Sequence, residues 1–538
     1  MAFPIRSPAS PKKTPNTRMR IPIGRFSAGG SRTNDRRSLI LSLTLALLLL
    51  APAWIVIGQR AEGTLSGLDE KKMMTIHLYG TPRERGVQYG LVACNEIRQN
   101  LDIFWKAVRN QGVSKSELVD KASERSLSQG MTEELRGLSE SSGVEYSELL
   151  AFNEFCPSVA HGGCTCFVAR GDVTLDGNPL SFKTMDYAGL GEGIQEVLVI
   201  VKPEEGNGYM GVTIAGAVGL SCQGINDKGL MIGYNWLPVP KYYESGLTPW
   251  EMQELVLEEC GSVDDAITLA YAMPKHEGVN LMVSDSEESA FIETAPSVYS
   301  PNVSYKIITS GFGVHTNHWL YEPFLSWVLD GWSYIWTRSV SRYDRAMGLG
   351  AEYEGELTAS LLISFTRDLE HWSNSPKGVM DSHPEYSTAT LWNGQPGNSI
   401  CNAATRSACV FEISKRYPTM LSTMWMALNN PCCSPFVPLH NAILYDAGSV
   451  AYADGQLTSF LSMKAYQLAG ALKKEYPLGA LVPTYVGWEA GIAEQTSANE
   501  VQAEALLNGG SYGAAASFLT EVDCSIALQA FDLQLSLV

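Results

Sequence analysis

The sequence predicts an α+β fold in which helices cover mainly antiparallel strands, preceded by a hydrophobic N-terminal segment. Helical patterns with capping residues fill the region from about 80 to 160, and short apolar runs separated by turn residues follow it. No internal repeat or Pro/Gly linker interrupts this body. With 538 residues, 45% of them hydrophobic, the chain can bury a large core. We therefore expect one large domain, with two domains divided near residue 350 as the alternative.

Residues 1–37 are expected to form a disordered basic arm. They are rich in Pro, Ser, Gly and Arg, and hold nine basic residues against the single acid Asp35. The full chain has 39 basic and 57 acidic residues, so the remainder has 30 and 56, a formal net charge of −26. Because phosphate binding needs a basic surface, this acidity argues against nucleic acid as a partner of the body.

Residues 38–58 predict a transmembrane anchor or an export signal. The run from Leu39 to Ile57, LILSLTLALLLLAPAWIVI, is uncharged, and at about 1.5 Å per residue it nearly spans a bilayer core of roughly 30 Å. The basic arm predicts a cytoplasmic N-terminus and an extracytoplasmic body. Asp35-Arg36-Arg37-Ser38-Leu39 resembles a twin-arginine signal and Ala51-Pro52-Ala53 a cleavage site, so the segment either anchors the protein or is removed.

Capping residues predict where the first helices begin. Thr81 and Glu84 form a capping box with Pro82 at the first helical position, which predicts a helix from there to about residue 108. Thr132 is expected to cap a second helix that ends at Gly143, and a third helix follows over residues 146–155. The region before residue 164 is therefore expected to be mostly helical.

Beyond residue 164 the pattern changes to a meander of strands. Asp-Gly at 176–177 and Asn-Asp-Lys-Gly at 226–229 supply hairpin turns. One helix over 248–273 interrupts the meander, and it begins with a second capping box. Further strands are expected at 407–414 and 420–428, and two or three amphipathic helices between 455 and 538.

Eleven cysteines are an odd number, so ten could pair in an oxidising compartment and leave one free thiol. Cys432 and Cys433 are expected to form disulfides or to be buried. The spacings contain no repeated C-x-x-C, no H-E-x-x-H and no compact Cys/His cluster, so we expect neither a metal site nor a cofactor.

The stretch HGGCTCFVAR at 161–170 leaves several roles open for Cys164: core residue, metal ligand, half of a disulfide, or nucleophile. A nucleophile needs a base, and the α-amino group of the same residue, with a pKa near 7.7–8.0, can provide one. That solution requires cleavage of the bond between Gly163 and Cys164, and the glycines before the cysteine allow an unusual backbone geometry there.

Several blocks, in order, resemble the acyl-coenzyme A:isopenicillin N acyltransferase family, whose kin include penicillin V acylase and the choloylglycine hydrolases. They are GTPRERGVQYG (80–90), TEELRGLSESSGVEYSELLAFNEF (132–155), GCT (163–165), T-x-D-G (174–177), M-D-Y (185–187), GINDKGL (224–230), HTNHWL (315–320) and SVSRYDR (339–345). Beyond residue 400, SACVFEISKRYPTMLSTMWMALNNPCCSPFVPLH resembles the C-terminal part of N-terminal-nucleophile dipeptidases.

The resemblance implies a proenzyme that cuts its own Gly163–Cys164 bond. The products would be a helical N-terminal piece, residues 62–163, and a catalytic piece, residues 164–538. The implied fold is the αββα sandwich of N-terminal-nucleophile hydrolases, with two stacked antiparallel sheets between helical layers.

The family's site roles transfer to five positions of this sequence. Cys164 would be the nucleophile, Asp186 would hold its new α-amino group, and Asn317 would donate to the oxyanion. Asn226 would sit at the same pocket, and Arg342 would organise Cys164 and Asp186 electrostatically and depress the pKa of the thiol.

Lys183 departs from the pattern, because the bile salt hydrolase branch has arginine three positions before the aspartate. Lysine offers a point charge in place of a planar fork.

Acyl-coenzyme A is a cytoplasmic metabolite, so an extracytoplasmic body favours hydrolysis over acyl transfer. We therefore expect an amidohydrolase that cleaves a small-molecule amide or acylated amine, with membrane attachment through the N-terminal helix and no prediction of oligomeric state. Two alternatives remain open: a dipeptidase, suggested by the later blocks, and a noncatalytic membrane-tethered binding or scaffold protein that never matures.

Overall fold

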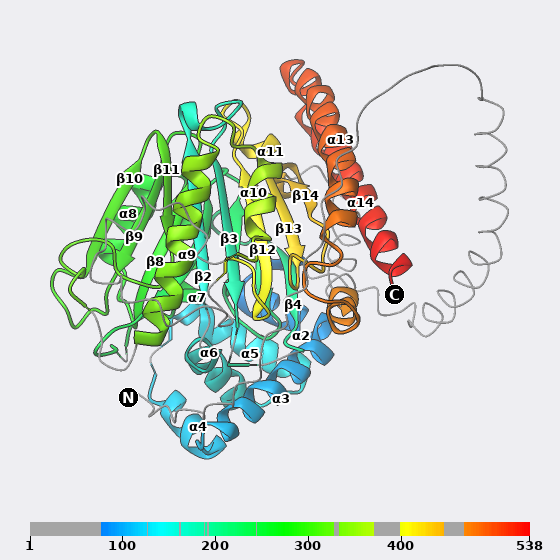
Figure 1. Ribbon diagram of the computed structural model, residues 1–538. Coiled ribbons are helices and arrows are strands. Elements are labelled where there is room, and N and C mark those ends of the chain that lie inside the picture. Colours follow the sequence, from blue (N-terminus) through cyan, green and yellow to red (C-terminus); the bar gives the residue numbers. More distant parts are fainter. Residues whose placement is uncertain are drawn as a thin grey trace, which may run out of the picture. The chain divides into compact units, whose positions relative to one another are not determined.

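Two β-sheets stack between layers of helices in this computed structural model (Figure 1). It describes residues 77–370 except 126, 161–162, 188, 191–192, 244 and 328–332, and also residues 399–445 and 467–538. The contacts group these described residues into one unit. The basic arm predicted at 1–37 and the hydrophobic segment predicted at 38–58 lie outside the described residues. Within the described ranges, no helix has both the length and the apolar character needed to cross a bilayer.

The larger sheet, sheet A, has the strand order β1-β4-β5-β6-β7-β8-β9-β10. All of its neighbouring strands pair antiparallel except β1 and β4, which are parallel. Its strands are β1 (His77–Gly80), β4 (Glu196–Pro203), β5 (Tyr209–Ile214), β6 (Gln223–Asn226), β7 (Met231–Leu237), β8 (Gly278–Ser284), β9 (Ser289–Thr294) and β10 (Val303–Ile308).

Sheet B is antiparallel throughout, in the order β11-β2-β3-β12-β13-β14. Every residue of its central strands β2 and β3 is buried, because the second sheet covers one face and helices cover the other. Its strands are β2 (Cys164–Arg170), β3 (Leu180–Asp186), β11 (Gly311–His315), β12 (Thr405–Glu412), β13 (Thr423–Leu428) and β14 (Val437–His440).

Helices from the N-terminal region, together with α7 and α8, cover sheet A, and helices from the second half of the chain cover sheet B (Figure 1). The first group is α2 (Pro82–Val92), α3 (Cys94–Asn110), α4 (Lys115–Ser123), α5 (Gln129–Ser142), α6 (Tyr146–Ala160), α7 (Pro249–Glu259) and α8 (Val263–Ala272). The second group is α9 (Ser333–Glu352), α10 (Ala359–Thr366), α13 (Val482–Asn508) and α14 (Tyr512–Ser536), and the short α11 (Pro418–Leu421) precedes β13. The predicted α+β class with two largely antiparallel sheets is confirmed.

Three helix boundaries differ from the prediction. The helix predicted from Pro82 to about residue 108 is divided at Ala93 into α2 and α3, and the one predicted over 248–273 is divided after α7. Ser128, and not Thr132, caps α5, because its hydroxyl accepts the backbone N–H of Met131 at 3.2 Å. Thr132 instead lies inside the first turn and donates its hydroxyl to the Ser128 carbonyl. Both predicted capping boxes are confirmed.

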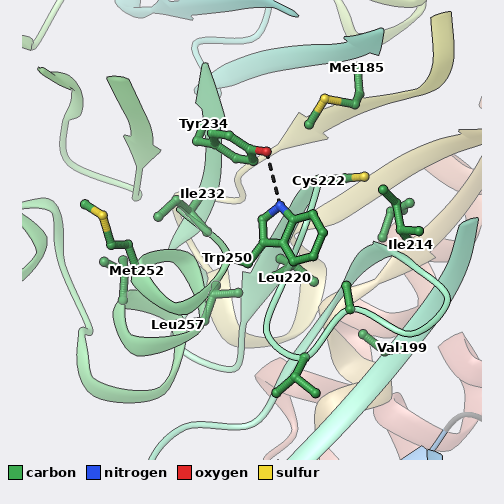
Figure 2. Close-up of a cluster of buried hydrophobic side chains, with 14 of the residues drawn as sticks. Met185, Val199, Ile214, Leu220, Cys222, Ile232, Tyr234, Trp250, Met252 and Leu257 are labelled. Atoms are coloured by element: carbon green, nitrogen blue, oxygen red, sulfur yellow. Dashed lines mark hydrogen bonds between the residues drawn. The ribbon is translucent and has the colours of Figure 1, made fainter. Parts of the chain in front are cut away.

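The core between the layers draws on both sheets. Figure 2 shows Tyr234 of β7, Trp250 of α7 and Met185 of β3 in one apolar cluster, in which the Trp250 indole donates to the Tyr234 hydroxyl at 3.2 Å. Met185 is also paired in register with Cys164, the first residue of β2. Cys164, the residue singled out by the sequence, therefore belongs to the main core.

Candidate active site

Cys164 is buried at the start of β2 and is held through its backbone. Its N–H donates to the side-chain oxygen Oδ1 of Asn317 at 2.8 Å. Its sulfur lies 3.4 Å from the sulfur of Met185 on the neighbouring strand. The nucleophile proposed from the sequence thus has a backbone N–H held by Asn317 and a thiol that lies against the Met185 sulfur.

The peptide bond before Cys164 lies within a polar group of side chains. The Gly163 carbonyl accepts the backbone N–H of Asp186 at 2.8 Å, which extends the β2–β3 pairing by one residue. A Cβ atom added at Gly163 would lie 2.8 Å from Oδ2 of Asp186 and 3.0 Å from both terminal nitrogens of Arg342. A side chain at residue 163 would therefore require the Asp186 carboxylate or the Arg342 guanidinium to move, and the constraint is one of space, since Gly163 does not adopt a positive φ.

Arg342 joins two of the other predicted site residues. Its Nη2 donates to Oδ1 of Asn317 at 2.6 Å and to the Cys164 carbonyl at 3.4 Å. Burial lowers the pKa of Arg342, and the negative charge of Asp186 opposes that shift. The structure thus brings Cys164, Asp186, Asn317 and Arg342 together from β2, β3, the segment after β11, and α9.

Two residues that no sequence motif indicates hold the Asp186 carboxylate. The Thr405 hydroxyl donates to Oδ1 at 2.6 Å, and Nδ2 of Asn402 donates to Oδ2 at 3.1 Å. Burial raises the pKa of Asp186, while Arg342 and these two hydrogen bonds lower it. Thr405 opens β12, which pairs with β3, so the contact exists only because the two strands are neighbours.

The segment after β11 that carries Asn317 is also fixed from two sides. The backbone N–H of Asn317 donates to the Ser339 hydroxyl of α9 at 2.7 Å. The buried Glu293 carboxylate of β9 accepts the N–H groups of Leu320 at 2.6 Å and Tyr321 at 3.1 Å, and its Oε1 lies 2.9 Å from Nε2 of His315. Ser339 falls inside a recognised sequence block, but Glu293 has no local signal that could have identified it.

Opposing effects act on the Cys164 thiol. Burial raises its pKa, Lys183 lowers it most among the charged neighbours, Asp186 raises it, and Arg342 and a hydrogen bond with Asn317 lower it. The sequence predicts that Arg342 lowers the pKa of this thiol. In the structure the larger cationic effect comes from Lys183 of β3.

Lys183 of β3 is fully buried, and its ammonium group lies between the two sheets. Its Nζ lies 3.5 Å from Oε1 of Gln223 and 5.3 Å from the centre of the Tyr234 ring. A cation over an aromatic face gains electrostatic stabilisation away from water. The neighbours that stabilise the Lys183 ammonium group are therefore a neutral amide and an aromatic ring.

Asn226 does not join this group, which corrects the expectation that it lies in the same pocket. Its Nδ2 donates to the carbonyls of Leu257 and Cys260, and its Oδ1 accepts the N–H groups of Lys228 and Leu230. Those bonds satisfy the side chain in the β6–β7 turn. Asn317 contacts the Trp236 carbonyl near the other end of β7, five residues from Met231 and therefore roughly 16 Å away at about 3.3 Å per strand residue.

The arrangement groups the kinds of side chain that nucleophilic attack on a carbonyl uses. It combines a thiol, a carboxylate held by two donors, an amide oxygen that accepts the Cys164 N–H, and a guanidinium donor. Across the part of the chain that the structure describes, no three His, Cys, Asp or Glu side chains are grouped as metal ligands.

Part of the chain matches the model of a known protein family. Residues 174–383 match the family model described as acyl-coenzyme A:6-aminopenicillanic acid acyl-transferase, and the resemblance predicted from the sequence is thereby confirmed. That stretch includes Lys183, Asp186, Asn226, Asn317 and Arg342, and it begins after Cys164.

Protein dcd1B of Dictyostelium discoideum is 24% identical over 271 residues, which cover 44% of this chain and 53% of that protein. An uncharacterized protein of Archaeoglobus fulgidus is also 24% identical over 271 residues, covering 43% of this chain and 45% of its own. The chain thus spans about half the length of these relatives.

Among solved structures, penicillin V acylase from Agrobacterium tumefaciens is 15% identical, with a TM-score of 0.29, over 49% of this chain and 83% of that chain. The C2A mutant of conjugated bile acid hydrolase from Clostridium perfringens is 11% identical, with a TM-score of 0.29, over 52% of this chain and 92% of that one.

Proposed function

Starting from the relationship of residues 174–383 to the acyl-coenzyme A:6-aminopenicillanic acid acyl-transferase family, we propose that this protein is an autoproteolytic cysteine N-terminal-nucleophile hydrolase. Its substrates are small molecules with a linear amide C–N bond, such as N-acylated amines. One observation carries the proposal: the Gly163–Cys164 peptide bond lies among Asp186, Asn317 and Arg342, with the Cys164 thiol on the residue that follows it.

Maturation begins with attack of the Cys164 sulfur on the carbonyl carbon of Gly163. The negative charge develops on the Gly163 oxygen, which already accepts the Asp186 backbone N–H. The C–N bond then breaks, the nitrogen takes a proton and becomes the α-amine of Cys164, and water hydrolyses the remaining thioester. Departure of Gly163 exposes the Asp186 carboxylate, because residue 163 fills the space beside it.

Turnover repeats the same chemistry on an external amide. The new α-amine accepts the thiol proton, since such an amine has a pKa near 7.7–8.0 and is partly neutral at physiological pH. The thiolate attacks the substrate carbonyl, the amine product leaves, and water resolves the acyl thioester. Asn317, Arg342 and Lys183 supply the polar and cationic environment around the sulfur.

The proposed place of action is outside the cytoplasm. The uncharged run from Leu39 to Ile57 behind a basic arm supports export or anchoring of the body. Protease added to intact cells should digest the body of the full-length chain, and the same protein without residues 1–58 should be protected. Protection of both would contradict this location.

The decisive test of the proposed activation is the integrity of the chain at residue 163. Purified protein should give two fragments on a denaturing gel, the larger beginning at Cys164 by N-terminal sequencing. Cys164→Ala should leave one band. Gly163→Ala should slow cleavage at least tenfold, because its methyl group meets Asp186 and Arg342, whereas Gly487→Ala, where a Cβ meets no atom within 4 Å, should cleave normally.

The matching test of the reaction uses mass spectrometry of the larger fragment. N-acyl amides should add the mass of the acyl group to Cys164 and release the free amine. Preferential release of amino acids from unblocked dipeptides would assign the protein to dipeptidases instead. Turnover by a chain that is uninterrupted between residues 163 and 164 would overturn the mechanism altogether.

A further inference from the structure

Two thiols from separate segments of the chain lie next to each other, close to the residues that hold Asp186. Cys401 lies in the segment before β12 and Cys432 in the connection between β13 and β14, and their sulfur atoms are 3.1 Å apart. Both residues are fully buried, and all eleven cysteines are thiols in this structure.

One asparagine organises both cysteines. Oδ1 of Asn430 accepts the Cys432 backbone N–H at 3.0 Å and lies 3.4 Å from the Cys401 sulfur. Its Nδ2 donates to the carbonyls of Asn402 at 2.7 Å and Thr405 at 3.2 Å. The backbone around both thiols is therefore already fixed by hydrogen bonds.

The two sulfur atoms need to approach by only about 1 Å to reach the covalent S–S distance of about 2.05 Å. We propose that Cys401 and Cys432 are a modification site that forms an intramolecular disulfide. The reaction is exchange with a small-molecule disulfide such as oxidised glutathione. One thiolate displaces a small thiol and forms a mixed disulfide, and the second thiol displaces the other small thiol. The protein loses two electrons and two protons, and the small disulfide is reduced to two thiols.

The crosslink would fasten the segment that supports Asp186. Asn402 and Thr405, which follow Cys401 by one and four residues, are the two side chains that donate to the Asp186 carboxylate. A covalent bond from Cys401 to the β13–β14 connection would add to the hold that Asn430 already has on the same segment. This inference goes beyond the proposed activity, because the bond forms whether or not residue 163 is cleaved.

Cys433 provides the matched control. It is adjacent to Cys432 and also buried, but its carbonyl accepts the Tyr485 hydroxyl at 3.0 Å, which ties it to α13. The structure brings the sulfur of Cys432 to Cys401. A disulfide at Cys401 should therefore select Cys432 over its neighbour.

The experiment is a peptide map of the full-length protein without reduction. The protein is incubated with oxidised glutathione, its remaining thiols are alkylated under denaturing conditions, and it is digested for mass spectrometry. The wild type and Cys433→Ser should both give a crosslinked peptide containing residue 401, lighter by two hydrogen atoms than its separate parts. Cys432→Ser and Cys401→Ser should not give it, and dithiothreitol should abolish it in the wild type.

Alkylation of both residues in the oxidised wild type, or a link from Cys401 to Cys433, would overturn the proposal. A second readout does not depend on the variants that remove the bond: oxidised wild type and Cys433→Ser should each unfold at a higher temperature than their reduced forms. Equal unfolding temperatures would overturn the stabilising role. Neither readout requires self-cleavage or turnover, so failure here and failure of the proposed function are distinguishable.

Discussion

Two buried cations act on the sulfur of Cys164, and they differ in how they are held. Arg342 is joined to Asn317 and to the Cys164 carbonyl, whereas Lys183 lies between Gln223 and the ring of Tyr234. Charges interact more strongly inside a protein than in water, because the surroundings screen them less. Lys183 lowers the pKa of the thiol more than Arg342 does, although burial outweighs both and raises it.

Replacement of Lys183 should shift the reactivity of Cys164 toward higher pH. Lys183→Met retains the apolar stem but removes the charge, so the thiol loses its main cationic stabilisation and its pKa rises. The rate of self-cleavage between pH 6 and 9 should fall at low pH by roughly tenfold per pKa unit gained. Lys275→Met, at another buried lysine, whose Nζ donates to the Ala270 carbonyl, should leave the profile in place. An unshifted profile for Lys183→Met would contradict this role.

The sequence could identify site residues that lie within recognisable blocks, but not those that act through strand pairing. Cys164, Asp186, Asn317 and Arg342 stand in such blocks and meet in the structure. Thr405 lies 219 residues from Asp186 along the chain, and no spacing rule links the two. Their contact depends on β12 pairing with β3, which is a property of the assembled sheet.

At the scale of elements, close approach of α2 and α5 depends on glycines. A Cβ added at Gly137 of α5 would overlap the Arg83 carbonyl oxygen of α2, and one at Gly86 would overlap the Glu134 carbonyl oxygen in return. Capping residues in the sequence indicate where α2 begins, because a helix cap depends only on residues that are close together along the chain. The close crossing of α2 and α5 could not be predicted, because an isolated glycine in a helical pattern mainly indicates a less stable helix.

Gly137→Ala should therefore destabilise the protein by roughly 3 kcal/mol, at the upper end for overpacking, since backbone atoms must move. Gly130→Ala in the same helix is the control. Its Cβ would lie 3.8 Å from the Pro82 side chain, an ordinary contact, so stability should hold or rise slightly. Equilibrium unfolding in urea measures both. A loss of stability in Gly130→Ala equal to that in Gly137→Ala would refute the explanation.

A buried ion pair attaches α14 to sheet B. The ring nitrogen Nδ1 of His440, at the end of β14, lies 2.7 Å from Oδ1 of Asp523. The backbone N–H of His440 donates to Oδ2 of Asp523 at 2.7 Å. Burial lowers the pKa of His440, but Asp523 and Glu500 outweigh it and raise it to about 10. Since the folded value exceeds the unfolded value of about 6.5, the stabilisation is complete below that pH and is lost as pH rises to about 10.

Replacement of His440 should remove this dependence on pH. The difference in free energy of unfolding between wild type and His440→Gln should be largest near pH 6 and decline steadily toward pH 10. His276→Gln is the control, because burial lowers the pKa of folded His276 to about 4 and the unfolded value is about 6.5, so neither state binds a proton above about pH 8. Between about pH 8 and pH 10 its difference from the wild type should stay constant, while that of His440→Gln still declines. Urea titrations at a series of pH values give both, and a constant difference for His440→Gln would refute the ion pair's role.

At the scale of the whole molecule, residues 77–163 belong to the same packed body as the chain that follows them. The sequence predicted a helical N-terminal piece. It did not predict β1, which is only four residues long and joins sheet A beside β4. It also could not show which strands the helices would cover, because that follows from topology. The boundary between the two proposed fragments therefore crosses a continuous core.

Buried hydrogen bonds also link the two proposed fragments across that boundary. Asn100 of α3 donates to the carbonyls of Gln195 and Ala215 and accepts the Gln195 N–H. Asn153 of α6 donates to the Gly216 carbonyl and accepts the Val218 N–H. These side chains are buried, so separation of the two fragments would leave several backbone groups exposed or without hydrogen-bond partners.

The two fragments should accordingly remain together after self-cleavage. Cleaved protein should elute from a gel-filtration column as one species under native conditions and separate only in denaturant, because one broken peptide bond leaves the shared core intact. The double variant Asn100→Ala, Asn153→Ala should release the smaller fragment at a lower urea concentration, since each lost hydrogen bond at a buried site costs about 1–3 kcal/mol. Asn110→Ala, at an exposed position of α3, should release it at the wild-type concentration. Elution of the smaller fragment alone from native wild-type protein would show that the helical piece is dispensable once cleavage is complete, and would exclude it from the structure of the mature enzyme.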